Sequence, residues 1–263
     1  MRPHYSLANK IKSNMRLLSY NIHKGIGGRD RRYQLERVIG VIEQENPDII
    51  CLHEVDRNVK RSRFNNQPKI FADYFNMPES LYQLNVKLKT GGYGNLILSR
   101  WSFLSQHQIS LTNKWRKARG AQIVLIDSPE GPFQLVNFHL GLAEKERHWQ
   151  INHLLTHRLF REGNDHPSLI VGDTNDWRNT LANGKFSEFE YQEVTSPPSR
   201  FRSFPAYMPV GTLDKAFIRG EIGIRQARLA RSQLSRQASD HLPLVIDFHL
   251  NEHASEWIKK AGQ

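Results

Sequence analysis

Short apolar segments alternate along the chain with segments that have the periodicity of amphipathic helices. Residues 15–23 (MRLLSYNIH) predict a strand, and residues 48–55 (DIICLHEV) form a continuous apolar run typical of a strand buried on both faces. Between them, apolar residues follow the i, i+3, i+4, i+7 spacing of a helix, at Leu35, Val38, Ile39 and Ile42. Asn46-Pro47 is expected to end this helix.

The same alternation continues to the end of the chain. Further strands are predicted at residues 94–100, 121–127, 133–140, 168–173, 213–220 and 242–250. The turn-like segment SPEGP separates two of them as in a hairpin, and a second helix is predicted over residues 143–160. Strands joined partly by turns and partly by helices indicate a mixed α/β protein. The segment HKGIGGRD lacks the spacing of a nucleotide-binding phosphate loop.

Length and composition fit a globular protein with one large catalytic domain, which we expect over residues 15–250. We interpret residues 1–14 as a basic leader without the apolar core of a signal peptide, and residues 251–263 as a C-terminal tail. No apolar run approaches the length of a transmembrane segment. The single cysteine, Cys51, lies in an apolar run and is expected to be buried. Without a disulfide framework, the chain is expected to be cytoplasmic.

The chain carries a formal net charge of +11. This charge favours anionic partners, which include nucleic acid, lipid head groups and phosphorylated small molecules. Charge alone does not choose among them.

Polar side chains stand at the margins of several predicted strands. The segment GDTND, after the strand at 168–173, has more acids and amides than a turn requires. Other strands begin or end with similar groups, so that the set comprises Asn21, Glu54, His139, Asp173, Asn175, Asp214, Asp240 and His241. In a layered α/β protein, strand ends and their loops converge at one edge, where ligands bind. We therefore expect these side chains to meet there.

The residue types suggest a chemistry. Carboxylate and amide oxygens suit a hard cation such as Mg²⁺ or Mn²⁺, and histidines beside carboxylates suit proton transfer. Together they favour metal-assisted hydrolysis of a phosphate ester. A zinc site is less favoured, since there is no HExxH motif and the series His148, His153 and His157 fits one poorly.

These motifs resemble the endonuclease/exonuclease/phosphatase superfamily, whose members include deoxyribonuclease I. The resemblance runs in order through LLSYNIHKG, PDIICLHEVDR, GNLILSR, LVNFHLG, LIVGDTND, SFPAYMPVGTLDKAFI and ASDHLPLVIDF. YNIHKG, EVDR and FPAYMP are most similar to a bacterial YbhP-like subgroup. The resemblance implies a four-layer α/β sandwich, in which two packed mixed β-sheets are flanked by helices.

The resemblance also implies roles for individual residues. Glu54 would be the principal metal ligand, helped by Asn21 and Asp240. Asp173 would align or deprotonate the attacking water. Asn175 would contact the scissile phosphate. His241, oriented by Asp214, would bind or protonate a phosphate oxygen, and His139 would protonate the leaving group. Arg119 is a further candidate for holding phosphate.

The chain departs from some relatives. His53 stands where many of them have glutamine, and HKG and VDR replace the motifs usual in abasic-site nucleases. These departures argue against a dedicated abasic-site repair enzyme.

Several functions stay open at this point. The first is a metal-dependent phosphodiesterase acting on nucleic acid, with weak sequence specificity, or on a phospholipid-type diester. The second is a phosphomonoesterase of the inositol-phosphate type, and the third is an inactive protein that binds anions. The basic segment RQARLARSQLSR (Arg225, Arg228, Arg231, Arg236) is a candidate phosphate track or an ordinary solvated edge. The segment NKWRKARG suits contact with a nucleic-acid strand and peripheral contact with a membrane equally well.

Overall fold

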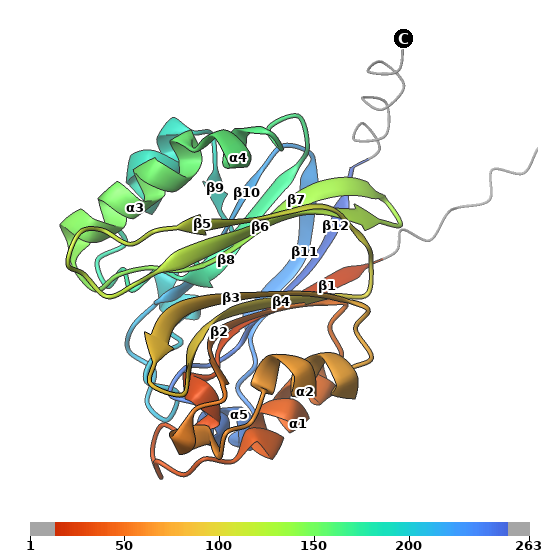
Figure 1. Ribbon diagram of the computed structural model, residues 1–263. Helices are drawn as coiled ribbons and strands as arrows, with labels where there is room; N and C mark the ends of the chain where they lie inside the picture. Colours follow the sequence, from red (N-terminus) through yellow and green to blue (C-terminus); the bar gives the residue numbers. More distant parts are fainter. Residues whose placement is uncertain (1–13, 252–263) are drawn as a thin grey trace, which may run out of the picture.

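Two six-stranded β-sheets pack face to face in the computed structural model, which describes residues 14–251 (Figure 1). The predicted leader and tail lie outside the described residues except for residues 14 and 251. The first sheet has the order β11-β12-β1-β2-β4-β3. Its strands are β1 (Met15–Asn21), β2 (Ile49–Arg57), β3 (Glu79–Leu88), β4 (Gly91–Ser99), β11 (Ile222–Leu229) and β12 (Leu244–Leu250).

The second sheet has the order β5-β6-β7-β8-β10-β9. Its strands are β5 (Phe103–Ser110), β6 (Gly120–Ser128), β7 (Gly131–His139), β8 (Ser168–Asp173), β9 (Gln192–Glu193) and β10 (Asp214–Arg219). Each sheet contains one parallel pair, β1 with β2 and β7 with β8, and the other pairs are antiparallel. Both sheets are therefore mixed.

Helices cover the outer face of each sheet (Figure 1). Helices α1 (Leu35–Glu45), α2 (Gln67–Tyr74) and α5 (Gln233–Ala238) share one apolar cluster with the first sheet. Helices α3 (Glu144–Thr156) and α4 (Arg158–Arg161) share another with the second sheet. A third cluster fills the space between the sheets, where Ile97 and Val124 are fully buried. The predicted four-layer sandwich is confirmed.

The remaining short elements are single turns of helix. They are η1 (His23–Gly25), η2 (Lys60–Ser62), η3 (Ala182–Phe186) and η4 (Pro198–Arg200). None of the helices between residues 14 and 251 is long and apolar enough to cross a membrane.

The apolar periodicity located α1 correctly, and the helix ends where Asn46 adopts a left-handed conformation with φ of 44°. The prediction of one helix over residues 143–160 was wrong. His157 has an extended backbone, and its ring nitrogen accepts a hydrogen bond from the Leu159 backbone N–H at 3.3 Å. His157 therefore ends α3 and caps α4. Cys51 is buried, as expected.

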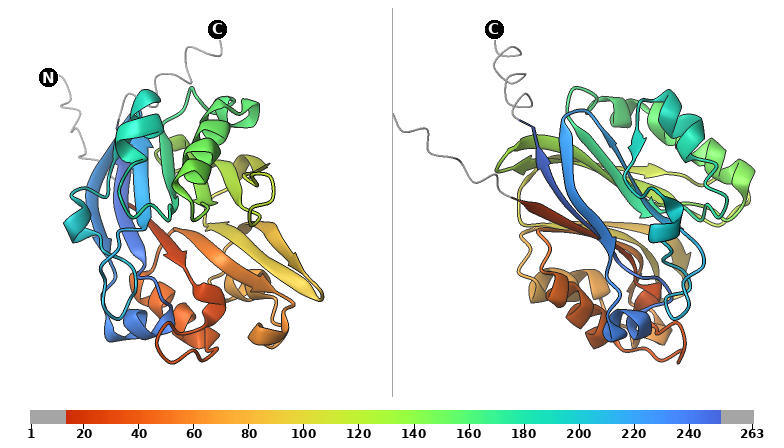
Figure 2. Two further views of the ribbon diagram at one scale, coloured as in Figure 1. Left: turned by 90° about the vertical axis from the view of Figure 1, so that its left-hand side faces the viewer. Right: turned by 180° about the vertical axis from the view of Figure 1, so that it is seen from behind.

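The strand ends that carry the candidate residues meet at one end of the sandwich. Asn21 at the end of β1 pairs with His53 in β2, and His139 at the end of β7 pairs with Asp173 at the end of β8. Asp214, the first residue of β10, also pairs with Asp173. This end of the molecule faces the viewer in the left view of Figure 2.

Candidate active site

The Asp173 carboxylate lies at the centre of the converging side chains. Its Oδ2 accepts a hydrogen bond from the Asn21 amide at 3.0 Å and lies 3.4 Å from His139 Nε2 and 3.7 Å from His241 Nε2. Its Oδ1 accepts from the Asn175 backbone N–H at 2.9 Å. The side chain is almost fully buried. Burial raises the pKa of Asp173 to about 6, although the neighbouring His241 opposes the shift.

His241 is held in place by Asp214. Its Nδ1 lies 2.7 Å from Asp214 Oδ2, which also accepts a hydrogen bond from the Ser203 hydroxyl at 2.6 Å. Burial disfavours the imidazolium, but Asp214 and Asp173 outweigh burial and raise the pKa of His241 to about 10. A protonated His241 therefore points Nε2–H toward the centre of the site, as an anion-binding residue requires.

His139 stays neutral in the same surroundings. Burial, reinforced by the positive charge of Arg119 and by the neighbouring His53, holds the pKa of His139 well below its usual range. A neutral imidazole can donate one N–H but is a weak source of a full proton. The guanidinium of Arg119 is itself buried, and its Nε has no hydrogen-bond partner among the described residues. An unpartnered buried donor next to His139 suits an anionic ligand.

Glu54 sits on a bulge in β2. The register between β2 and β4 shifts between Leu52 and Val55, and Glu54 adopts a left-handed backbone with φ of 58°. Such bulges re-aim side chains and are common beside active sites. The Lys24 ammonium forms an ion pair with the Glu54 carboxylate. Burial favours the neutral acid, but Lys24 and the nearby His23 outweigh it and lower the pKa of Glu54 to about 2.

Asp240 lies on the other side of η1. Its Oδ2 is 3.8 Å from Nδ1 of His23, whose backbone N–H donates to Asn21 Oδ1 at 3.1 Å. A Cβ on Gly28 would lie 2.6 Å from the Asp240 Cα, so the backbone approach here requires glycine. Asn21 and η1 thus connect Glu54 and Asp240 at one end of the molecule.

This donor set fits a hard divalent cation. Glu54, Asn21 and Asp240 supply only oxygen donors, and Glu54 is ionised despite its burial, with a cationic group as its partner. Across residues 14–251, no three His, Cys, Asp or Glu side chains are arranged as a metal-binding cluster. Carboxylate and amide oxygens are donors that Mg²⁺ prefers, and Mg²⁺ can be held by one or two carboxylates because it keeps several waters.

The two acids of GDTND have different environments. Whereas Asp173 faces the site, Asp176 is buried beside Lys215 Nζ at 3.5 Å and Arg147 at 3.4 Å. It also accepts the Leu181 backbone N–H at 3.0 Å. Asp176 thus holds the loop that carries Asn175, whose side-chain amide donates to the Leu140 carbonyl at 2.9 Å.

Sequence reasoning missed three contributors to the site. Lys24 pairs with Glu54, Ser203 supports Asp214, and Asp176 anchors the loop after β8. All three residues stand in quoted motifs, Lys24 in YNIHKG, Ser203 in SFPAYMPVGTLDKAFI and Asp176 in GDTND, but these motifs do not indicate the contacts that the residues make.

The arginines of the basic segment have separate environments. Arg228 pairs with Glu45, and Arg231 donates to the backbone carbonyls of Arg200 and Arg202. Arg236 lines a groove of about 570 Å³ beside the Asp240 loop, together with Arg29, Asp30, Arg37, Tyr207, Gln233 and Gln237. The segment is therefore not a continuous phosphate track.

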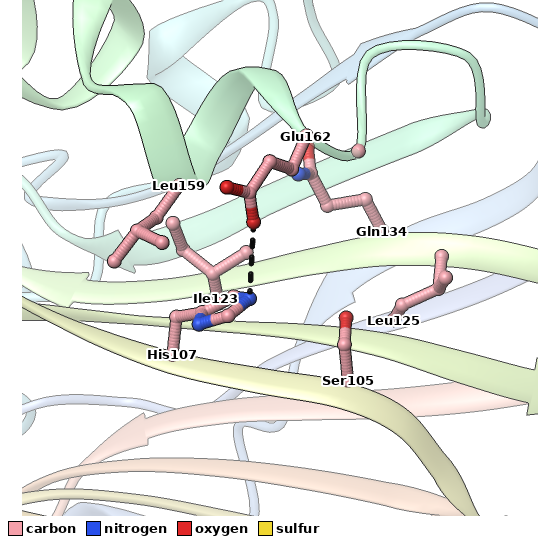
Figure 3. A pocket seen from close by; sticks show the side chains of 8 residues that line it. Ser105, His107, Ile123, Leu125, Gln134, Leu159 and Glu162 are labelled. Carbon is pink, nitrogen blue, oxygen red and sulfur yellow. Dashed lines mark ion pairs between the residues drawn. The ribbon is translucent and has the colours of Figure 1, made fainter.

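A second, smaller cavity lies on the outer face of the second sheet, between β5, β6, β7 and α4 (Figure 3). It has a volume of about 30 Å³, the size of one water molecule. His107 and Glu162 form an ion pair across it at 3.6 Å. The cavity is too small to bind a substrate.

His53 is fully buried beside His139, with the two ring centroids 5.9 Å apart. Its Nε2–H donates to Asn137 Oδ1 at 2.7 Å, whereas Nδ1 is buried without a partner among the described residues. Burial lowers the pKa of His53 to about 4. In the unfolded chain the pKa of a histidine is about 6.5. As the pH falls, the unfolded state therefore binds a proton at His53 at a higher pH than the folded state does.

We therefore expect His53 to contribute to the loss of stability between pH 6.5 and pH 4. The His53→Gln variant retains an amide donor for Asn137. Between pH 6.5 and pH 4, its free energy of unfolding should fall by about 3 kcal/mol less than that of the wild-type protein. Urea unfolding of both proteins at a series of pH values measures the difference. Identical pH slopes for the two proteins would contradict the assignment.

The fold and this arrangement define a two-sheet α/β sandwich of the deoxyribonuclease I kind. The crystal structure of an endonuclease/exonuclease/phosphatase from Beutenbergia cavernae DSM 12333 superposes with a TM-score of 0.78 at 21% identity, over 90% of this chain and 72% of that one. The human Nocturnin catalytic domain with bound sulfate superposes with a TM-score of 0.71 at 21% identity, over 90% of this chain and 94% of that one.

The sequence places the chain in a family. The model of the endonuclease/exonuclease/phosphatase family matches residues 18–241, and the chain belongs to that family. It is also 27% identical over 248 residues to the uncharacterized protein YbhP from Escherichia coli (strain K12). The alignment covers 90% of this chain and 97% of YbhP. The resemblance to YbhP-like proteins is confirmed.

Proposed function

We propose that the protein is a divalent-metal-dependent hydrolase of phosphate esters, and specifically a phosphodiesterase. The observation that carries the proposal is the environment of Asp173. One carboxylate oxygen faces Asn21, His139 and His241, and a second acid, Asp214, fixes His241 from behind. Such a pairing of a buried carboxylate with a cationic histidine suits the activation of water beside an anionic ester.

Each residue then has a defined task. Asp173 orients the attacking water and accepts its proton, and protonated His241 donates a hydrogen bond to a phosphate oxygen. Arg119 and Asn175 hold the remaining phosphate oxygens. Neutral His139 donates its N–H to the oxygen of the leaving group, and transfer of a proton from His139 to this oxygen stays a prediction from the sequence.

Glu54, Asn21 and Asp240 are the residues that would hold the metal ion, Mg²⁺ or Mn²⁺. The bound ion would neutralise charge that develops on the phosphate. Lys24, which pairs with Glu54 in this structure, would then have to share or leave that carboxylate.

Two substrate classes fit a phosphodiesterase with this charge, namely nucleic acid and phospholipid-type diesters. A phosphomonoesterase uses the same groups and differs in its preference for a terminal phosphate. A cytoplasmic location stays a prediction based on cysteine content.

The test compares soluble diester and monoester substrates. We expect purified protein with Mg²⁺ to hydrolyse bis-p-nitrophenyl phosphate, and excess EDTA to abolish the activity, which is followed by release of nitrophenolate. Faster hydrolysis of p-nitrophenyl phosphate than of the diester would favour the phosphomonoesterase. The absence of hydrolysis with every divalent metal and either substrate would favour an anion-binding protein.

A further inference from the structure

Exposed large apolar side chains gather around the candidate active site. Eleven such side chains are exposed among the described residues, and eight of them, seven in loops and Leu88 at the end of β3, lie at the end of the sandwich that carries the site. We call these eight the rim: Phe64, Leu88, Trp115, Leu142, Trp177, Tyr207, Met208 and Val210. The exposed fraction is largest for Trp115, at 98%.

Contacts connect several rim loops to the site itself. The Trp177 ring packs edge-on against Phe204 at 5.9 Å, and Phe204 lies 4.9 Å from the His241 ring. The backbone N–H of Ala206, next to Tyr207, donates to the Asp240 carbonyl at 2.7 Å.

The other rim loops continue strands that end at the site. The loop with Trp115 leads into Gly120, which pairs with His139, and Leu142 follows His139 by three residues. On the other sheet, Leu88 ends β3 at the β3–β4 turn. Gly92 in β4, just after this turn, pairs with Arg57, which follows Glu54 by three residues. These loops surround the end of the molecule shown in the left view of Figure 2.

Exposed cations stand next to four of the eight rim side chains in the sequence. Leu88 stands between Lys87 and Lys89, and Trp115 stands between Lys114 and Arg116. Phe64 follows Arg63, and Trp177 precedes Arg178, which lies 4.0 Å from Glu144. The one acid next to a rim residue in these four loops, Asp176, is buried beside Lys215.

Exposed apolar side chains alternating with Lys and Arg are typical of surfaces that bind anionic membranes. Nucleic acid would also attract the cations, and its bases stack on aromatic rings. Half of the rim, however, is not aromatic: Leu88, Leu142, Met208 and Val210 offer nothing to a base or a phosphate. An apolar lipid layer suits aromatic and aliphatic side chains alike, and anionic head groups match the cations.

We propose that the rim docks the protein on an anionic lipid bilayer, so that the site faces the phosphodiester of a lipid head group. Docking depends only on the surface, whereas the choice of a lipid as substrate rests on the proposed function. Of the two proposed classes of diester substrate, nucleic acid and phospholipid, the rim favours the phospholipid.

The test measures binding of the full chain to vesicles by sedimentation, in EDTA so that no turnover occurs. We expect binding to vesicles that contain phosphatidylglycerol and phosphatidylcholine, and little binding to phosphatidylcholine alone. The double variant Trp115→Ser/Leu142→Ser should bind the anionic vesicles at least about tenfold more weakly, because two apolar side chains no longer enter the lipid.

A control variant, matched in residue type, removes one exposed tryptophan and one exposed leucine away from the rim. Leu104 on β5 and Trp149 on α3 are 55% and 40% exposed, and Leu104→Ser/Trp149→Ser should bind vesicles as the wild-type protein does. Equal weakening by both double variants would overturn the proposal. So would wild-type protein that fails to bind anionic vesicles or that binds a single-stranded oligonucleotide more tightly than vesicles.

Turnover of soluble bis-p-nitrophenyl phosphate, assayed in parallel with Mg²⁺, separates the two proposals. Rim variants that keep this turnover but lose vesicle binding support docking. Wild-type protein that hydrolyses the soluble diester without binding vesicles refutes docking alone. Wild-type protein that binds vesicles but hydrolyses neither soluble diester nor lipid refutes the proposed function alone.

Discussion

The Glu54→Gln variant is expected to lose at least about a thousandfold in metal-dependent hydrolysis while it keeps its fold. Hydrolysis of a phosphodiester requires a barrier reduction on the order of 20 kcal/mol, whereas acid–base help from side chains is worth about 10²–10⁴-fold. The proposed metal must therefore supply much of the remainder, and Glu54 is its principal proposed ligand. Glutamine has the same size as glutamate but lacks its negative charge. In the wild-type protein, the ion pair with Lys24 stabilises this charge.

Initial rates on bis-p-nitrophenyl phosphate at saturating Mg²⁺ measure this loss. Excess EDTA should bring the wild-type protein to the same residual rate. Calorimetric titration with Mg²⁺ should show binding to the wild-type protein and none to the variant. The control is Glu43→Gln, an exposed acid on α1 that accepts a hydrogen bond from Tyr74 and has no contact with the site. If the rate of the Glu54→Gln variant were within tenfold of the wild-type rate, Glu54 would not be the principal metal ligand.

The sequence was most informative where strands are buried on both faces. Strands β2, β4 and β8 contain the apolar stretches IICL, LIL and LIV, because both sides of these strands pack against other layers. Strands β3, β5 and β11 escaped prediction because they lie at or near sheet edges and expose polar side chains, as in FLSQHQIS of β5. Exposed strands have no apolar signature to detect.

The convergence of the candidate residues could be predicted from the sequence, but the geometry of the candidate site could not. Polar groups at the margins of apolar runs indicated one end of the sandwich, where β1, β7 and β8 end and β10 begins. The protonation of His139 and His241 was not predictable, because it depends on which of two similar histidines faces Asp214 and which faces Arg119. Likewise, nothing in HKG indicates that Lys24 turns back onto Glu54.

The two acids of GDTND, Asp173 and Asp176, provide the second large effect, because they stand three positions apart in the sequence and have different tasks. Asp173→Asn should reduce kcat by at least about a thousandfold, since an amide cannot accept the proton of the attacking water. The fold should survive, because the amide oxygen can still accept from Asn21 and the exchange preserves the volume of the buried side chain.

Asp176→Leu should instead destabilise the protein by about 3–5 kcal/mol, because it leaves the buried ammonium of Lys215 without its carboxylate partner. Thermal or urea unfolding and kcat, measured on both variants, separate the two effects. The double variant Asp176→Leu/Lys215→Met, which removes both charges, should recover much of the lost stability, since an apolar pair can replace a buried ion pair. If Asp173→Asn lowered stability as Asp176→Leu does, the carboxylate at the centre of the site would be structural, and the reaction would need a different base.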